Sequence, residues 1–111
     1  MGTEADDQQP FSLVVEREGS VGRLRLTGEL DLETGAQVLD AIATPQVAGA
    51  ERWVIDCRDL VFVDSGGLRA LLATAEHAGG LASLTLVAPQ DQLRNLLEAA
   101  GLLDAIAITP A

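Results

Sequence analysis

The residues best suited to chemistry in this chain lie in the segment Asp64-Ser65-Gly66-Gly67, between an apolar run and an amphipathic one. Asp64 or Ser65 falls at the N-cap of the predicted helix, where its side chain can accept a hydrogen bond from a first-turn amide. Each of the two glycines costs a helix roughly 1 kcal/mol relative to alanine. Their presence predicts that bare backbone is needed for the close approach of another molecule. A hydroxyl at the positive end of a helix also suits a phosphoryl group.

The alternative interpretation is a plain capping turn that takes the chain from strand to helix. The sequence offers no catalytic partner for Ser65 that would argue against this interpretation. The only histidine, His77, lies twelve residues beyond Ser65 on the same predicted helix. That spacing corresponds to roughly 18 Å, too far for a base. His77 and the only cysteine, Cys57, do not form a zinc motif.

Three aspartates cluster near one predicted strand end and suggest a magnesium pocket: Asp56, Asp59 and Asp64. Turn and capping roles on a solvated rim explain them better, because these are ordinary positions for aspartate. We therefore expect no enzymatic activity, no bound cofactor and no metal site.

The charge balance excludes several classes of partner. Seventeen acidic residues against seven arginines and no lysine give a formal charge of −10. Such a chain repels phosphate backbones and anionic lipid heads, so we expect no nucleic acid and no membrane surface among its partners. No apolar run approaches the roughly 18 residues of a membrane helix, and the acidic N-terminus lacks a signal pattern. We expect a soluble, cytoplasmic protein.

The chain of 111 residues fits a single domain. Residues 1–10 are acidic, lack a large apolar side chain after Met1 and end in proline, which predicts a solvated tail before a domain at 11–111. Alternating apolar residues around Leu13 and around Leu24 predict two strands. The turn residues Gly19 and Ser20 join them into an antiparallel hairpin.

Three apolar stripes at helical spacing follow, and each ends at a helix-stopping residue. The stripes consist of Leu32, Ala36, Leu39, Ile42 and Ala43 before Pro45; Leu68, Leu71, Leu72 and Ala75 before Gly79-Gly80; and Leu93, Leu96, Leu97 and Ala100 before Gly101. Strands are predicted at 53–57, 84–87 and 106–108. The first of these is apolar on both faces as far as Asp56, which is typical of a central, covered strand.

The predicted order is therefore β-β-α-β-α-β-α-β. Helices that alternate with short buried strands indicate an α/β fold, in which a mostly parallel mixed sheet packs against amphipathic helices.

Two motifs on these elements carry a family resemblance, and a third segment supports it. They are Gly28-Glu29-Leu30-Asp31, Phe62-Val63-Asp64-Ser65-Gly66-Gly67-Leu68, and Leu96-Leu97-Glu98-Ala99-Ala100-Gly101-Leu102. In this order the segments resemble the STAS family, and within it the anti-sigma factor antagonists. The resemblance covers residues 11 to about 108.

The resemblance implies a partner switch that regulates transcription. In such families the antagonist, or anti-anti-sigma factor, binds an anti-sigma factor that is also a serine kinase, and the sigma factor is released. The kinase then phosphorylates the serine after the motif aspartate, here Ser65, and binding is lost. Partner-binding residues are expected at Asp31, Asp64, Ser65, Gly66 and Leu68. Gly66 departs from the family's usual Ser or Thr.

The same resemblance assigns the ATP, ADP and magnesium to the partner kinase, and it implies a serine phosphatase that resets the switch. The free domain is expected to be a monomer. Two alternatives stay within this fold. The domain could be a non-switching scaffold that docks onto a transport ATPase, or it could bind a nucleotide at the helix N-terminus, although the net charge opposes tight nucleotide binding.

Overall fold

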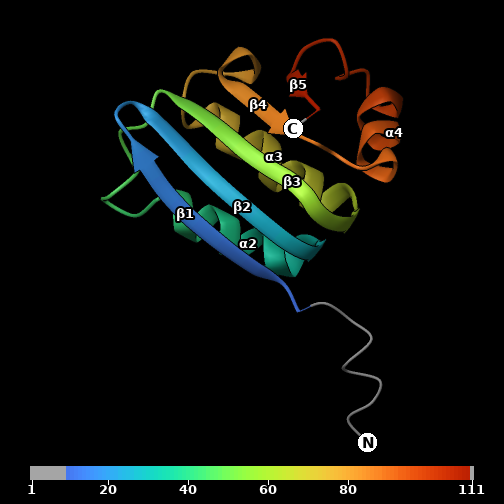
Figure 1. Cartoon of the computed structure of the whole chain (residues 1–111), viewed down its shortest axis with the longest axis horizontal. Coiled ribbons are helices and arrows are strands. Elements are labelled where there is room, and N and C mark those ends of the chain that lie inside the picture. Colours follow the sequence, from blue (N-terminus) through green and yellow to red (C-terminus); the bar gives the residue numbers. More distant parts are fainter. Residues whose placement is uncertain (1–9, 111) are drawn as a thin grey trace, which may run out of the picture.

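The computed structural model describes residues 10–110, so the predicted tail lies outside the described residues except for Pro10. The sheet begins with strands β1 (Ser12–Glu18) and β2 (Val21–Leu30), which pair antiparallel (Figure 1). Gly19 and Ser20 form the turn between them, and Gly19 has a φ of +62°, a conformation that favours glycine. The predicted hairpin is confirmed.

The remaining elements continue the predicted alternation. They are helix α2 (Leu32–Ile42), strand β3 (Arg52–Val63), helix α3 (Ser65–Glu76), the 3₁₀ turn η1 (Leu81–Ser83), strand β4 (Leu84–Val87), helix α4 (Asp91–Ala99) and strand β5 (Ala107–Thr109). The five strands lie in chain order, and every pair except β1–β2 is parallel. The predicted α/β class and element order are confirmed.

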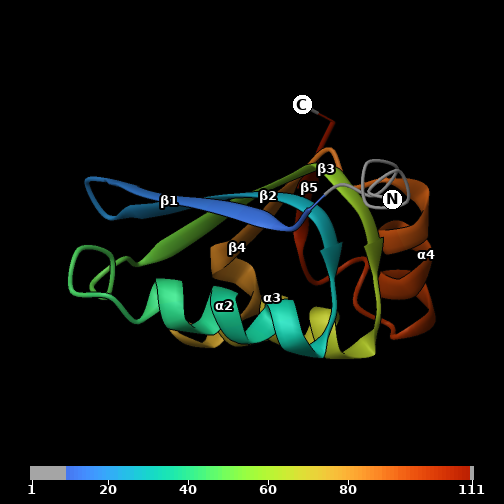
Figure 2. The ribbon, with the colours of Figure 1, turned by 90° about the horizontal axis from the view of Figure 1, so that it is seen from below.

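The helices cover one face of the sheet, with α2 and α3 side by side beneath it (Figure 2). Each parallel strand is added on the same side of the previous one, so crossovers of one hand bring their helices to the same face. The expectation that the strand at 53–57 is covered on both sides is therefore wrong. Trp53, Ile55 and Cys57 are buried toward the helices, while Val54 and Asp56 are half-buried on the open face.

Helix α2 packs with a different face from the one that the apolar stripe predicts. Its buried residues are Gly35, Val38 and Ile42, whereas Leu32 is 73% exposed and Leu39 is 38% exposed. The reason is the close contact between α2 and α3. A Cβ on Gly35 would lie 3.0 Å from the Cβ of Ala70, so the smallest residue of α2 faces α3. A prediction based on apolar side chains alone cannot identify a glycine as the residue at the point of contact.

Irregularities in the β2–β3 pairing shape the end of the sheet where the motifs lie. β3 has twelve residues and β2 has ten, and the register shifts twice, between Arg25 and Thr27 and between Gly28 and Glu29. Such bulges bend and twist strands, and both strands curl toward the helices at this end (Figure 2). The second shift also breaks the alternation of β3, so the consecutive residues Val61 and Phe62 are 48% and 41% exposed.

The observed orientation of α2 predicts losses of stability of different size for two neighbouring substitutions. Val38→Ala removes a fully buried side chain and is expected to lower the free energy of unfolding by about 2 kcal/mol. Leu39→Ala, the matched control, removes a larger but exposed side chain and is expected to cost about 0.5 kcal/mol or less. Urea unfolding followed by circular dichroism measures both. A larger loss at Leu39 than at Val38 would contradict the orientation of this helix.

Candidate functional site

The ends of β2 and β3 bring two aspartates to the starts of two helices. Asp31 is the N-cap of α2, and Asp64 is the N-cap of α3. Leu30 and Val63, the residues before them, are register partners in the parallel pair. The backbone N–H of Asp64 also donates to the carbonyl oxygen of Leu30 at 3.2 Å. The two motifs of the sequence therefore meet at one end of the sheet.

Asp64, and not Ser65, caps helix α3. Its Oδ1 accepts from the backbone N–H of Gly67 at 2.8 Å, and its carbonyl oxygen accepts from the N–H of Leu68 at 2.8 Å. Ser65 is the first residue of the helix and is exposed. Its hydroxyl forms no hydrogen bond with the part of the chain that the structure describes. The hydroxyl is thus held on a fixed backbone and is available to another molecule.

The two glycines after Ser65 allow the chain to approach itself. A Cβ on Gly67 would overlap the carbonyl oxygen of Leu30 and lie 2.7 Å from its carbonyl carbon. A Cβ on Gly66 would lie 3.0 Å from the N, Cα and Cβ atoms of Leu32. The expectation that this bare backbone serves another molecule is therefore wrong for Gly67, which is buried against β2. The close approach of Leu32 also gives a reason for glycine at 66 in place of the Ser or Thr that the family resemblance leads us to expect.

Of the five residues predicted to bind a partner, four lie at the surface and one does not. Asp31, Asp64 and Gly66 are half-buried and Ser65 is exposed. Leu68 is 8% exposed and belongs to the core, so little of its side chain is accessible to a partner.

One apolar residue at this end of the molecule is exposed, although the predicted apolar stripe placed it on the buried face of its helix. Leu32, the first residue of α2, is 73% exposed and lies against Gly66. We call the group Asp31, Leu32, Asp64, Ser65 and Gly66 the Ser65 surface. Two further large apolar residues with exposed side chains, Val61 and Phe62, precede Asp64 in the chain. The exposure of Leu32 could have been predicted from its position directly after the N-cap, before the buried face of the helix begins.

Hydrogen bonds hold the Asp31 carboxylate in its charged form. Its Oδ1 accepts from the backbone N–H of Thr34 at 2.9 Å, and the Thr34 hydroxyl accepts from the backbone N–H of Asp31 at 2.9 Å. This is a reciprocal capping box. The bond from the Thr34 backbone is the main cause that lowers the pKa of Asp31 below its ordinary value of 3.8. Asp31 therefore contributes a negative charge to the Ser65 surface at neutral pH.

A side chain of α4 completes the support of the site. β3 runs past the end of β4, because the last register partner of β4 on β3 is Asp56. At Val63, where β3 has no pairing with β4, the side chain of Gln92 of α4 forms hydrogen bonds of the kind that a neighbouring strand would form. Its Oε1 accepts from the backbone N–H of Val63 at 2.9 Å, and its Nε2 donates to the Val63 carbonyl at 2.8 Å. No local pattern predicts this pair, since the two residues are far apart in the chain.

The other candidates do not form a reactive centre. Burial, with a smaller effect of Asp56, raises the pKa of the Cys57 thiol to about 12, so this core residue is not a nucleophile. His77 is exposed at the opposite end of α3 from Ser65, with Nδ1 3.0 Å from the carbonyl oxygen of Ala73. Within residues 10–110, no three His, Cys, Asp or Glu side chains are grouped so as to hold a metal ion.

The aspartates that suggested a magnesium pocket have other contacts. Asp56 forms an ion pair with Arg58 at 3.2 Å, and Asp59 forms one with Arg25 at 3.8 Å. Asp64 caps α3. Each of these carboxylates thus has a partner of its own, as turn and capping aspartates do.

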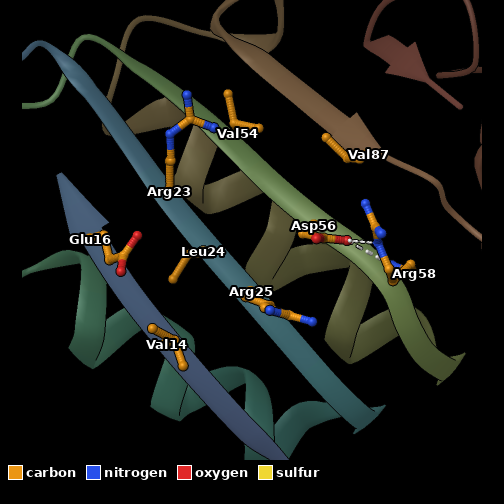
Figure 3. A pocket seen from close by; sticks show the side chains of 9 residues that line it. All are labelled: Val14, Glu16, Arg23, Leu24, Arg25, Val54, Asp56, Arg58 and Val87. Atoms are coloured by element: carbon orange, nitrogen blue, oxygen red, sulfur yellow. Dashed lines mark hydrogen bonds and ion pairs between the residues drawn. The ribbon is translucent and has the colours of Figure 1, made fainter. Parts of the chain in front are cut away.

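The open face of the sheet contains a shallow hollow of about 450 Å³ (Figure 3). Its lining combines apolar side chains with charged side chains of β1, β2 and β3. Glu16 lies opposite Arg23 across the β1–β2 pair, and Arg25 lies opposite Asp56 across the β2–β3 pair. Opposite charges in such cross-strand positions stabilise a sheet. The hollow is therefore explained as a solvated sheet face on which acidic and basic side chains lie opposite one another.

Comparison with known families identifies the chain. The family model described as Mlab, STAS domain matches residues 13–109. The chain belongs to the STAS domain family. No match is found among curated proteins. In the described part of the chain, no helix has both the length and the apolar character that crossing a bilayer requires.

Several solved structures share the fold. An anti-sigma factor antagonist from Mycobacterium paratuberculosis is 26% identical with a TM-score of 0.76, and the match covers 92% of this chain and 87% of that one. The anti-sigma factor antagonist SpoIIAA in its unphosphorylated form is 25% identical with a TM-score of 0.69, covering 89% and 87%. The phosphorylated form of the Bacillus SpoIIAA gives 22% identity and a TM-score of 0.62, covering 87% and 90%.

The contact between Gly67 and Leu30 predicts that this glycine is required for folding. Gly67→Ala places a methyl group on a backbone carbonyl, and we expect a loss of about 3 kcal/mol or more in the free energy of unfolding. Ser65→Ala, two residues earlier on the same turn, removes only an exposed hydroxyl and is expected to change stability by less than about 0.5 kcal/mol. Thermal unfolding compares the two, and equal stability of both variants would contradict the close approach.

The lowered pKa of Asp31 predicts a pH-dependent contribution to stability. The ionised carboxylate stabilises the fold above the ordinary value of 3.8, and this contribution is lost as the pH falls through the lowered pKa. Asp31→Ala is therefore less stable than the wild type at about pH 5 and above, and the difference shrinks below pH 3.8. Urea unfolding across this range measures it, with Asp40→Ala as a control for charge removal on α2. A difference that is constant with pH would contradict the assignment.

Proposed function

We propose that this chain is an anti-sigma factor antagonist that binds an anti-sigma factor with its Ser65 surface. Membership of the STAS family and the likeness to two antagonist structures over most of both chains support this role. The observation that carries the proposal is the exposed Ser65 hydroxyl, which has no hydrogen-bond partner in the described residues and stands on the capped first turn of α3. The exposed Leu32 beside it supplies apolar area for a contact.

The proposed partner is an anti-sigma factor that is also a serine kinase. It transfers the γ-phosphoryl group of ATP to Oγ of Ser65. The new O–P bond forms as the bond to ADP breaks, and a base of the kinase takes the serine proton. The nucleotide and the magnesium ion belong to the kinase, and this chain acts as its substrate. SpoIIAA is known in unphosphorylated and phosphorylated forms, which supports a modification of the same kind here.

Phosphorylation weakens the complex through charge and solvation. A phosphate adds about −1.5 to −2 charges next to Asp64 and near the ionised Asp31. In the free domain the phosphate remains in water, whereas at an interface it would be desolvated beside these carboxylates. A penalty of about 3 kcal/mol is enough to weaken binding more than a hundredfold. A serine phosphatase, which hydrolyses the phosphate ester, would restore the binding form.

Substitutions at Ser65 test the switch in a pull-down from host lysate with ADP and magnesium. Ser65→Ala removes the acceptor hydroxyl but adds no charge, so it is expected to retain the kinase as the wild type does. Ser65→Glu adds a charge at the interface and is expected to release the kinase. Ser20→Glu is the matched control, because it adds the same charge to an exposed serine in the β1–β2 turn, at the far end of β2 (Figure 1).

The captured protein is identified by mass spectrometry and then incubated with ATP and each bait. Incorporation of one phosphate into the wild type and none into Ser65→Ala is the expected result. Equal retention of a transport ATPase by the wild type and by Ser65→Glu would contradict the switch, and it is the outcome that a non-switching scaffold would give.

A further inference from the structure

Arg69 is the nearest arginine to Ser65 along the chain, and nothing in the proposed function uses it. Both residues are exposed on α3, four positions apart, while Gly67, Leu68 and Ala70 between and beside them are buried. Residues four apart on a helix are neighbours on its surface, about 6 Å apart between Cβ atoms. The side chains of Ser65 and Arg69 therefore lie on the same exposed face of α3, about one helical turn apart.

The guanidinium of Arg69 forms no ion pair with any residue in the range 10–110. Its helical neighbours at spacings of three and four are Ser65, Gly66, Leu72 and Ala73. None of these carries a charge in the unmodified chain. Only Ser65 can acquire one, by phosphorylation.

The surroundings of Ser65 are otherwise acidic. Asp64 precedes it, Asp31 caps the neighbouring helix α2, and Glu33 lies in the first turn of that helix. A phosphate at Ser65 would meet these carboxylates without a compensating cation unless Arg69 provides one. An arginine presents two parallel N–H groups that match two phosphate oxygens, so it is well suited to this task.

We propose that Arg69 binds the phosphate of phosphorylated Ser65 within the same chain and holds it against the first turn of α3. This inference rests on the proposed function and names the residue that receives the product of the kinase. In the unmodified chain Arg69 is free to contact a partner, and after phosphorylation it is occupied. The modification then removes a cation from the surface in addition to placing an anion on it.

The test measures the ionisation of the phosphate directly. Phosphoserine is incorporated at position 65 during translation, so no kinase is needed, and the phosphate is titrated by ³¹P NMR. The second pKa of a phosphoserine is about 6. An adjacent guanidinium favours the dianion, so Arg69→Gln is expected to raise this pKa by roughly 0.3 units or more relative to the wild type. Arg69→Lys should retain part of the effect, because it keeps the charge but loses the paired N–H groups.

Arg94→Gln is the matched control, since it removes the same charge from an exposed position on α4. It is expected to leave the phosphate pKa unchanged, and circular dichroism confirms that each variant is folded. Equal pKa values in the wild type and Arg69→Gln would overturn the proposal, as would an equal shift in Arg94→Gln. Because the phosphate is installed without the kinase, the titration gives its answer even if the pull-down shows that no kinase binds.

Discussion

The close backbone approach between the end of β2 and the first turn of α3 is the contact on which the rest of the site depends. The Leu30 carbonyl accepts from the N–H of Asp64 and lies directly against Gly67. The register shifts of β2 and β3 bend both strands so that this approach is reached. A second small-residue contact, Gly35 against Ala70, lets α2 and α3 pack closely enough to place their N-caps together.

These backbone contacts hold some parts of the site in a fixed position and leave other parts able to change. The capping bonds of Asp31 and Asp64 and the burial of Gly67 fix the backbone, so the position of Ser65 does not depend on a ligand. Only the exposed side chains of the surface remain adjustable. A charge added there, as the proposed phosphorylation would add it, requires no rearrangement of the fold.

Much of this arrangement could be predicted from local patterns. The alternation around Leu24 and the helical spacing from Leu68 to Ala75 predict elements that the structure confirms, because each pattern is satisfied by one packed face. Three features escaped prediction, each for a tertiary reason. Leu32 is exposed because a glycine, and not a leucine, faces α3. Phe62 is exposed because a bulge interrupts the alternation. Gln92 supports Val63 through a contact between distant parts of the chain.

The paired hydrogen bonds of Gln92 also join regions that would otherwise open independently. Helix α4 cannot separate from the sheet without freeing the N–H and the carbonyl of Val63, the residue before the cap of α3. Local unfolding of α4 is therefore linked to loosening of the site, so the two behave as one cooperative unit in native-state hydrogen exchange. The amide of Val63 should then show the same protection from hydrogen exchange as the buried amides of α4. A partner that holds the site in place would also slow hydrogen exchange in α4, a helix that it does not touch.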